Sequence, residues 1–363
     1  MLEGLDDRWD VVGLAAGSQA SALCAQAHKF HPEGVALVDE GPSSRNSDWT
    51  DKSIRTFRGA HALVELVDHV PCDCVVSAVV GLGGLAATIR AVELGRRVAL
   101  ANKEAMVIAG ALLIPLAAQT GAQLIPVDSE HSGVFQTLHA GQRADLRRVY
   151  LTASGGPFRT WSSERMAGAT LEDALRHPTW NMGPKISIDS ATMMNKALEI
   201  IEARWLFDLR PQQIGVIVHP ESIVHSLVEF RDGSVVAQLG APDMRTPIQY
   251  ALTYPDRMAC PSDRLDLTAM SRLTFESPDE ERFLALGLGH EVAQRGGTCG
   301  AVLNAANEAA VALFRRGAIR FGDIVPLVKQ TLSEHQCLAT PTLDELLAAD
   351  RWARQEVTRC TTC

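Results

Sequence analysis

The chain has 363 residues, of which 46% are hydrophobic, and a length of this kind predicts about two to three domains. The net charge of −9 argues against nonspecific nucleic-acid binding, which favours basic surfaces, but small anionic ligands need only a few local cations. The eight cysteines lack the paired C-x-x-C motifs of a structural zinc site, so we expect reduced thiols in a cytoplasmic protein.

The first third of the chain alternates short apolar segments with helical patterns such as Ser21–Phe30 and Leu85–Leu94. This alternation predicts βαβ units and a Rossmann-like parallel sheet. The glycines between Ser77 and Gly84 leave a strand and open a helix, where ligands approach such sheets. The expected strands are Val11–Ala15, Gly34–Val38, Cys74–Ala78, Val98–Ala101 and Gln123–Val127.

No strand and no G-x-G-x-x-G motif precede residue 10. A dinucleotide-binding domain normally begins with a strand, a glycine-rich turn and a helix that holds the pyrophosphate. We therefore expect the chain to begin partway through such a domain, with Met1–Asp7 as the tail of a helix. About 20 residues would be missing, the length of a strand, a turn and most of a helix, and their absence would leave an exposed sheet edge.

Val107–Val127 is an uncharged run long enough to cross a bilayer. Two prolines and several polar residues dilute its hydropathy, so we interpret it as a buried helix followed by a strand. Met1–Asp10 is acidic and lacks the apolar stretch of a signal peptide. We expect no membrane partner.

The pattern changes after Arg148. Four segments resemble the strands of an antiparallel sheet, and one helix, about Ala191 to Phe207, interrupts them. Residues 254–278 are typical of a linker, and the rest is helical by periodicity. We therefore expect an α/β protein with a dinucleotide-binding domain (1–127), a central α+β catalytic domain (128–253), a linker (254–278) and a C-terminal helical domain (279–363). The four expected strands are Val149–Ala153, Ile214–Val218, Ser226–Phe230 and Ser234–Gln238.

Asp128 and Glu130 follow the strand that ends at Val127. Residues i and i+2 at a strand end point the same way, so both carboxylates can face one spot at the carboxyl edge of the sheet. Hard oxygen ligands suit Mg²⁺ or Mn²⁺. From these residues alone, a solvated loop tip is an equally plain alternative.

The helix that contains Asn195, Lys196 and Glu199 supports the site. Asn195 and Glu199 are four residues apart and share a helix face. Asp189 or Ser190 resembles an N-cap, and a helix N-terminus favours an anion. An amphipathic helix with a polar outer face is the alternative.

Two further segments suggest ligand contacts. Leu151–Phe158 is a strand that ends in two glycines, whose N–H groups could surround a phosphate together with the Ser154 hydroxyl; a plain turn is the alternative. Arg176–Lys185 has no regular period and joins His177, Trp180 and Met182 between prolines. This composition suggests a lid, or else a packed Ω-loop.

Together these segments closely resemble the 1-deoxy-D-xylulose 5-phosphate reductoisomerase family. The matches occur in the family's order from about residue 10 to the end of the chain. They are Ala99–Glu104, Pro126–His131, Leu151–Phe158, Arg176–Trp180, Lys185–Lys196, Glu199–Phe207, His219–Ser222, Ala241–Pro247 and Leu303–Glu308.

The resemblance implies NADPH-dependent conversion of 1-deoxy-D-xylulose 5-phosphate to 2-C-methyl-D-erythritol 4-phosphate, a step in isoprenoid precursor synthesis. It also implies a homodimer and a divalent metal, Mn²⁺ or Mg²⁺ with Co²⁺ as a further option, that polarises the substrate's ketone and hydroxyl oxygens.

The resemblance also implies a role for individual residues. The metal ligands would be Asp128, Glu130 and Glu199. The phosphate would be held by Ser154, Ser190, Asn195 and Lys196. The sugar backbone would contact Ser129 and Lys103, and the lid would be formed by His177, Trp180 and Met182. The cofactor would contact Gly17, Ser18, Gln19, Asn102, Glu104 and Gly183.

The chain departs from the family in two places. The family's Gly-Ser-Thr-Gly-Ser-Ile-Gly turn, which binds the NADPH pyrophosphate, is absent, and a truncated or misassigned start would explain this. Ser18 and Gln19 stand where the family usually has a basic residue and Asn near the adenosine 2′-phosphate. The residues therefore leave the preference between NADPH and NADH open.

Two other functions compete with an active reductoisomerase. An inactive or binding-only remnant could hold metal and sugar phosphate without turnover, because the pyrophosphate-binding turn is absent. A different NAD(P)-dependent oxidoreductase or a metal-dependent aldolase is disfavoured, because neither would have this carboxylate triad and lid in this order.

Overall fold

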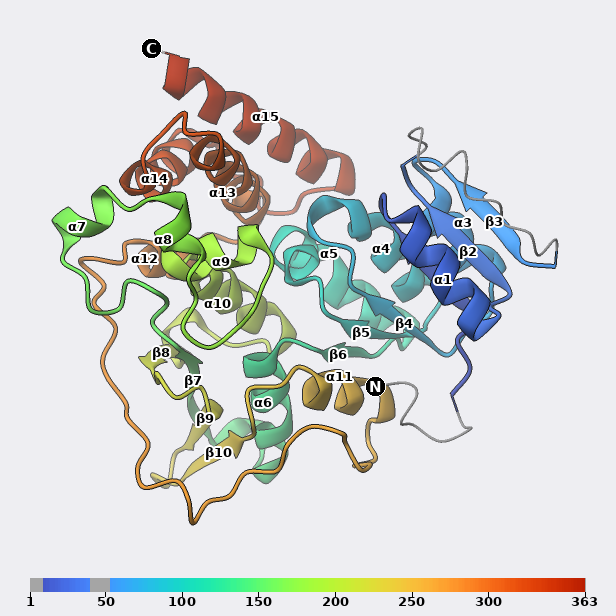
Figure 1. Ribbon diagram of the computed structural model, residues 1–363, viewed down its shortest axis with the longest axis horizontal. Coiled ribbons are helices and arrows are strands. Elements are labelled where there is room, and N and C mark those ends of the chain that lie inside the picture. Colours follow the sequence, from blue (N-terminus) through green and yellow to red (C-terminus); the bar gives the residue numbers. More distant parts are fainter. Residues whose placement is uncertain (1–8, 40–52, 363) are drawn as a thin grey trace. The chain divides into compact units, whose positions relative to one another are not determined.

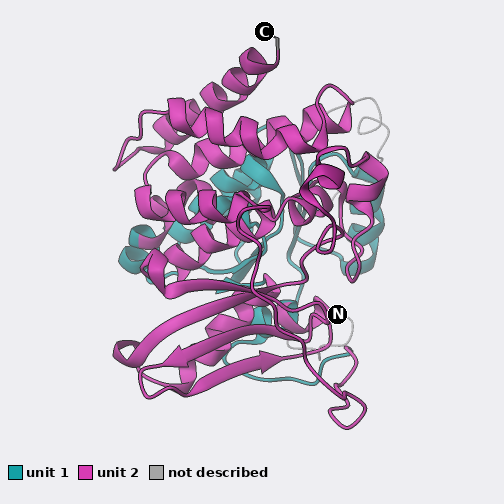
Figure 2. Ribbon diagram, turned by 90° about the vertical axis from the view of Figure 1, so that its left-hand side faces the viewer, with its two compact units in different colours: residues 1–105, 115–127, 248–261 teal, residues 106–114, 128–247, 262–363 magenta. Residues whose placement is uncertain are grey.

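The computed structural model describes residues 9–39 and 53–362 of the chain (Figure 1). The helix tail expected at residues 1–7 lies outside them. Two compact units can be distinguished (Figure 2). Unit 1 comprises residues 1–105, 115–127 and 248–261, and unit 2 comprises residues 106–114, 128–247 and 262–363. Each unit is described by itself.

Unit 1 alternates strands and helices, as expected for βαβ units. All five predicted strands are present, with shifts of a few residues at their ends. The elements in chain order are β1 (Gly13–Ala16), α1 (Ala20–Phe30), β2 (Gly34–Leu37), β3 (Arg55–Arg58), α3 (Ala62–His69), β4 (Cys74–Ser77), the 3₁₀ turn η2 (Gly81–Gly84), α4 (Leu85–Glu93), β5 (Arg97–Leu100), α5 (Lys103–Thr120, which also enters unit 2) and β6 (Leu124–Pro126).

The strands of unit 1 are all parallel, as predicted, and they are arranged in two three-stranded sheets. Their orders are β1-β2-β3 and β4-β5-β6, and every pairing is parallel. Within the described residues, β1 pairs only with β2 and β4 only with β5. Both strands therefore present an edge, and Val76 on β4 is 50% exposed.

Strand β3 was not predicted. Its sequence, Arg-Thr-Phe-Arg, has no run of apolar residues, and only Phe57 is shielded from solvent. It pairs in register with β2, from Gly34 opposite Arg55 to Leu37 opposite Arg58. Pairing with the buried strand β2 holds β3 in the sheet. The side chains of β3 therefore give little indication in the sequence that this segment is a strand.

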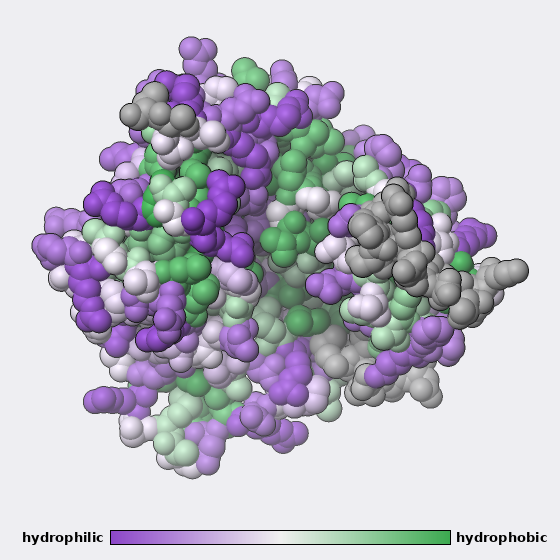
Figure 3. Space-filling model, turned by 45° about the horizontal axis from the view of Figure 1, so that its top comes forward, coloured by the Kyte–Doolittle hydropathy of each residue, from purple (hydrophilic) through white to green (hydrophobic). Residues whose placement is uncertain are grey.

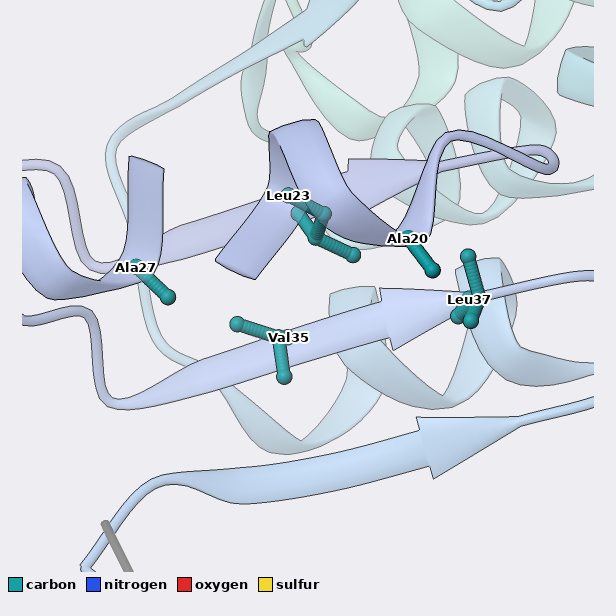
Figure 4. Packing of buried hydrophobic residues seen from close by; sticks show 5 residues of the cluster. All are labelled: Ala20, Leu23, Ala27, Val35 and Leu37. Carbon is teal, nitrogen blue, oxygen red and sulfur yellow. The ribbon is translucent and has the colours of Figure 1, made fainter. Parts of the chain in front are cut away.

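Helix α1 covers one face of the first sheet (Figure 4). Ala20, Leu23 and Ala27 recur at helical spacing and are buried against Val35 and Leu37 of β2. The helix ends at His31, which adopts a left-handed conformation with φ 47°. The amphipathic period of α1 thus becomes a packed layer between helix and sheet.

Unit 2 contains a mixed sheet and most of the helices. The elements are α6 (Ser129–Thr137), η3 (Leu138–Ala140), η4 (Arg143–Asp145), β7 (Leu146–Ala153), α7 (Ser163–Ala167), α8 (Leu171–Leu175), α9 (Pro184–Ala191), α10 (Met194–Leu206), η5 (Pro211–Gln213), β8 (Ile214–Val218), β9 (Val224–Phe230), β10 (Val235–Leu239), α11 (Arg245–Thr253, which enters unit 1), α12 (Ala285–Arg295), α13 (Cys299–Arg315), η6 (Phe321–Asp323), α14 (Ile324–Glu334) and α15 (Leu343–Thr362).

The sheet of unit 2 has the order β10-β9-β7-β8. The four predicted strands are present, but the expectation of a wholly antiparallel sheet is wrong, because β7 and β8 are parallel. Parallel neighbours require a crossover, and α9 and α10 lie in this connection. Strands β9 and β10 are antiparallel, as expected.

The helix predicted from about Ala191 to Phe207 is present as α10, which begins at Met194, and a separate helix, α9, directly precedes it. The chain breaks at Met193, whose φ of 61° is left-handed. The Thr192 hydroxyl bonds back to the Ile188 carbonyl at 3.2 Å and accepts from the Met194 N–H at 3.2 Å. Asp189 and Ser190 therefore lie at the end of α9 and do not cap α10, which corrects the N-cap prediction.

The region from Asp279 onward is helical, as predicted. Helix α13 packs against α14 and α15. At Gly300, an added Cβ would lie 2.0 Å from the Val107 carbonyl oxygen, so only glycine permits this close approach. Residues 254–278 contain one β-bridge, between Glu276 and Val218, and no helix or strand.

Helix α5 is the one helix of the described residues that is long and apolar enough to cross a membrane, and half of the tested window is buried. This is weak evidence for a span, because buried core helices pass the same test. Pro115 lies inside the helix, and Ala109 has a non-helical backbone. The face in Figure 3 carries many polar side chains, with smaller apolar areas between them.

We predict that Leu23→Ala lowers the free energy of unfolding by about 2–5 kcal/mol, because Leu23 is 1% exposed and its removal leaves a cavity between α1 and β2. Leu94→Ala, at a 40% exposed position of the same unit, should change it by no more than about 0.5 kcal/mol. Urea unfolding of both variants measures the difference. Equal losses would contradict the packing described for α1.

Candidate active site

The predicted acidic residues meet in unit 2. One carboxylate oxygen each from Asp128, Glu130 and Glu199 lies within 4.8 Å of the others. Asp128 caps the N-terminus of α6 and accepts from the Glu130 N–H at 3.2 Å. Glu130 therefore lies in the first turn of a helix and not in an extended strand end, which corrects the local geometry behind the prediction. Three hard oxygen donors this close suit Mg²⁺ or Mn²⁺.

Lys196 balances part of this negative charge. Its ammonium group donates to Glu130 at 2.7 Å and also to Glu199, and the residue is 3% exposed. Burial opposes the charged form, but Glu130, Glu199 and Asp128 together raise the pKa of Lys196 above its ordinary value. The Lys196 ammonium group thus already pairs with two of the three carboxylates. The cluster can therefore accommodate a positively charged ligand.

His131 lies directly behind the cluster and is fully buried. Its Nε2 faces the Glu199 carbonyl at 3.0 Å, while its Nδ1 faces Asp128 at 3.1 Å and Glu202 at 3.4 Å. Both ring nitrogens thus face acceptors, as an imidazolium requires. Burial would lower the pKa of His131, but Glu202 and Asp128 outweigh it and raise the pKa to about 9. His131 therefore holds Asp128 in place, and with Asp128 and Glu202 it forms a second group of close potential ligand atoms.

Two other predicted residues also bind the carboxylates. Asn195 donates its amide to Glu199, and the Ser129 hydroxyl donates to Glu130. In this structure Asn195 and Lys196, expected at the phosphate, therefore contact the acidic cluster. Their phosphate role remains a prediction.

Ser154 and His177 lie together. The Nδ1 of His177 accepts the Thr179 and Trp180 N–H groups at 3.1 and 2.9 Å. Its other nitrogen, Nε2, therefore carries the proton and donates to the Ser154 hydroxyl at 3.1 Å. Burial lowers the pKa of His177, in agreement with a neutral ring. The predicted lid is thus attached to a predicted phosphate ligand.

Ser190 approaches the same turn through its backbone. A Cβ on Gly156 would lie 2.7 Å from the Ser190 carbonyl oxygen, and Gly156 has a φ of 66°. The Gly156 N–H donates to the Ser154 hydroxyl at 3.2 Å. The glycine turn after β7 and the end of α9 are therefore in close contact, which brings Ser154 and Ser190 into one region.

The predicted cofactor residues fall into both units. Gly17, Ser18 and Gln19 follow β1 at its carboxyl end, and nothing lies within 4 Å of a Cβ built on Gly17. Asn102 caps α5, accepting from Ala105 N–H and donating to the Gly81 carbonyl at 3.0 Å. Lys103 and Glu104 begin α5, and Gly183 is the N-cap of α9 in unit 2.

Models of the 1-deoxy-D-xylulose 5-phosphate reductoisomerase family match the chain in three stretches. The family model itself covers residues 1–110, and its two C-terminal domain models cover residues 124–207 and 239–356. The reductoisomerase of Chlorobium chlorochromatii is 49% identical over 96% of this chain and 91% of its own length. That of a Synechococcus species is 47% identical over 96% and 90%.

The chain belongs to the 1-deoxy-D-xylulose 5-phosphate reductoisomerase family. Solved structures of family members agree with this. The Zymomonas mobilis reductoisomerase in complex with NADPH superposes with a TM-score of 0.90 at 43% identity, over 98% of this chain and 92% of that one. A reductoisomerase bound to NADPH, fosmidomycin and magnesium gives a TM-score of 0.92 at 38% identity, over 99% and 94%.

Sequence reasoning missed three titratable residues next to the carboxylate cluster. His131 and Glu202 support Asp128 from behind, and His225 on β9 is 7% exposed. Burial lowers the pKa of His225 despite the attraction of Glu130, so it stays neutral beside the carboxylates. Glu202 lies three residues after Glu199 on α10, a spacing that places both on one side of a helix and that could have revealed it.

We predict that Lys196→Gln destabilises the metal-free protein by about 3–5 kcal/mol, because the buried carboxylates lose their cation. Mg²⁺ should restore part of this loss, since it supplies replacement charge. Thermal unfolding with EDTA and with Mg²⁺ measures both effects. Lys329→Gln, at an exposed position, is the control, and a loss that Mg²⁺ does not reduce would contradict the charge balance proposed for Lys196.

The raised pKa of His131 predicts a pH dependence in EDTA. Its folded-state pKa of about 9 exceeds the ordinary histidine pKa of 6.5, so its stabilisation is complete below about pH 6.5 and is lost as the pH rises through about 9. The total is roughly 3 kcal/mol. Urea unfolding against pH should show this loss in the parent protein but not in His131→Gln, and parallel pH profiles would contradict the assignment.

Proposed function

We propose that this chain converts 1-deoxy-D-xylulose 5-phosphate to 2-C-methyl-D-erythritol 4-phosphate, with NADPH and a divalent metal, in isoprenoid precursor biosynthesis. One observation carries the proposal: the three carboxylates of Asp128, Glu130 and Glu199 meet within 4.8 Å in a chain that is 47–49% identical to named reductoisomerases. Solved relatives contain NADPH and magnesium.

Asp128, Glu130 and Glu199 would hold the metal, which when bound polarises the ketone and hydroxyl oxygens of the substrate. Mg²⁺ is proposed, with Mn²⁺ or Co²⁺ as alternatives that accept the same oxygen donors. NADPH would supply the hydride, and its proposed contacts are Gly17, Ser18, Gln19, Asn102, Glu104 and Gly183.

The chain's own residues would position the substrate. Ser154 and Ser190 would hold the phosphate, together with Asn195 and Lys196. A phosphate clamp away from the reacting carbons supplies orientation. Ser129 and Lys103 would contact the sugar backbone.

His177, Trp180 and Met182 would close over the substrate and exclude water from the reacting intermediate. The hydrogen bond from His177 to Ser154 supports this, because it attaches the lid to the residue that would hold the phosphate. A neutral His177 also avoids a buried charge in the closed lid.

We further propose that the protein is a cytoplasmic homodimer.

The test is NADPH oxidation by the purified chain with 1-deoxy-D-xylulose 5-phosphate and Mg²⁺. The parent protein should turn over, and Glu199→Gln should abolish turnover and weaken Mg²⁺ binding by more than about 100-fold, the upper range for a residue that only supports a ligand. Glu334→Gln, at an exposed position, should behave as the parent.

Two outcomes would contradict the proposal. Unchanged turnover in Glu199→Gln would exclude the metal assignment. An inactive parent that stays inactive after a strand and glycine turn from a relative are fused to its N-terminus would exclude the activity. Binding of substrate and Mg²⁺ without NADPH oxidation would then favour a binding-only protein.

A further inference from the structure

A buried carboxylate at the end of α9 is bound from two sides. Asp189 is 1% exposed. Its Oδ2 accepts from Lys185 at 2.8 Å, one turn earlier on the same helix, and its Oδ1 accepts from the amide of Asn307 at 2.8 Å. Asn307 lies on α13 and is fully buried. Asp189 therefore links α9 to the C-terminal helices.

Helix α9 connects the two parts of the proposed phosphate end of the site. It begins directly after the lid segment, with Gly183 as its N-cap. It ends beside Ser190, whose carbonyl oxygen packs on Gly156 of the turn that carries Ser154. Any shift of α9 would therefore move Ser190 against Ser154 and move the end of the lid.

Neither helix stability nor core packing favours this arrangement. A carboxylate in the last turn of a helix faces the negative end of the helix dipole, and a lysine that precedes its acidic partner is the weaker order of such a pair. The Oδ1 of Asn307 is buried with no hydrogen-bond partner among the described residues. Replacing both partners of such a buried pair by apolar residues of the same shape can be nearly neutral or stabilising, so core packing alone does not require Asp189 and Asn307 here.

We infer that Asn307 is a positioning residue for the phosphate end of the site: by holding Asp189, it fixes α9 and with it Ser190 and the base of the lid. This inference rests on the proposed function. Asn307 does not touch the reacting groups and acts through Asp189. Its role is to fix the distance between Ser154 and Ser190, the two serines proposed to bind the phosphate.

The test is Asn307→Leu, which removes the hydrogen bond and the unsatisfied oxygen while keeping the volume similar. We expect the KM for 1-deoxy-D-xylulose 5-phosphate to rise about 10-fold or more, the size of a lost hydrogen bond to a charged group, with a smaller change in kcat. The Mg²⁺ affinity should stay within about 2-fold, because additivity holds for sites without shared partners.

Asn304→Leu is the matched control. Asn304 lies on the same helix, is also fully buried and also has an unsatisfied Oδ1, but its amide donates to Glu308 at 3.1 Å and not to α9. It should leave KM unchanged. The exchange Asp189→Asn with Asn307→Asp restores a hydrogen bond between the two positions and should recover part of the KM. Asn307→Ser carries the same expectation as Asn307→Leu if the leucine variant does not fold.

The outcomes separate this inference from the proposed function. A parent protein that turns over, with KM unchanged in the Asn307 variants or raised equally in Asn304→Leu, would overturn the positioning role alone. A parent protein without turnover counts against the function itself. A loss of thermal stability with an unchanged KM would show that Asn307 only holds the fold.

Discussion

The chemistry of unit 2 depends on a buried balance of charge. Asp128, Glu130 and Glu199 would repel one another at this spacing. Lys196 and the His131 imidazolium pair with these carboxylates and reduce their mutual repulsion in the folded state. Removing charge from water is costly unless it is paired and hydrogen-bonded. The contacts of Lys196 and His131 with the carboxylates therefore hold the three acidic side chains together as a preformed set of oxygen ligands.

The backbone conformation at two positions brings the carboxylates of this cluster together. The cap by Asp128 turns the chain from β6 into α6, so Glu130 follows within one helical turn. The left-handed Met193 separates α9 from α10, at a cost of roughly 1–2 kcal/mol for a residue with a side chain. That break lets α9 approach the turn after β7 while α10 presents Glu199 to α6. A continuous helix could not change direction between these two positions.

Sequence patterns alone predicted the strands with continuous apolar residues and the positions of the clustered carboxylates. Strands with apolar runs, such as β2 and β5, and the carboxylates after β6 could be inferred locally. Strand β3 and the break at Met193 could not, because Arg-Thr-Phe-Arg has no strand pattern and no glycine or proline marks the break. The contacts of His131 with Glu202 and of Asp189 with Asn307 join residues that are 71 and 118 positions apart, and only the tertiary fold brings them together.

The position of Lys196 links metal and phosphate binding. Its ammonium group is held by Glu130 and Glu199 in this structure, whereas the proposed function also assigns it to the phosphate. One ammonium group has three donors and can serve both only if the anions are close. Under the proposed function, Glu130 and Glu199 would pair with a bound divalent cation in place of Lys196, and the Lys196 donors would then be available to the phosphate. Metal binding would in that case favour substrate binding through Lys196, and the two binding free energies would be coupled.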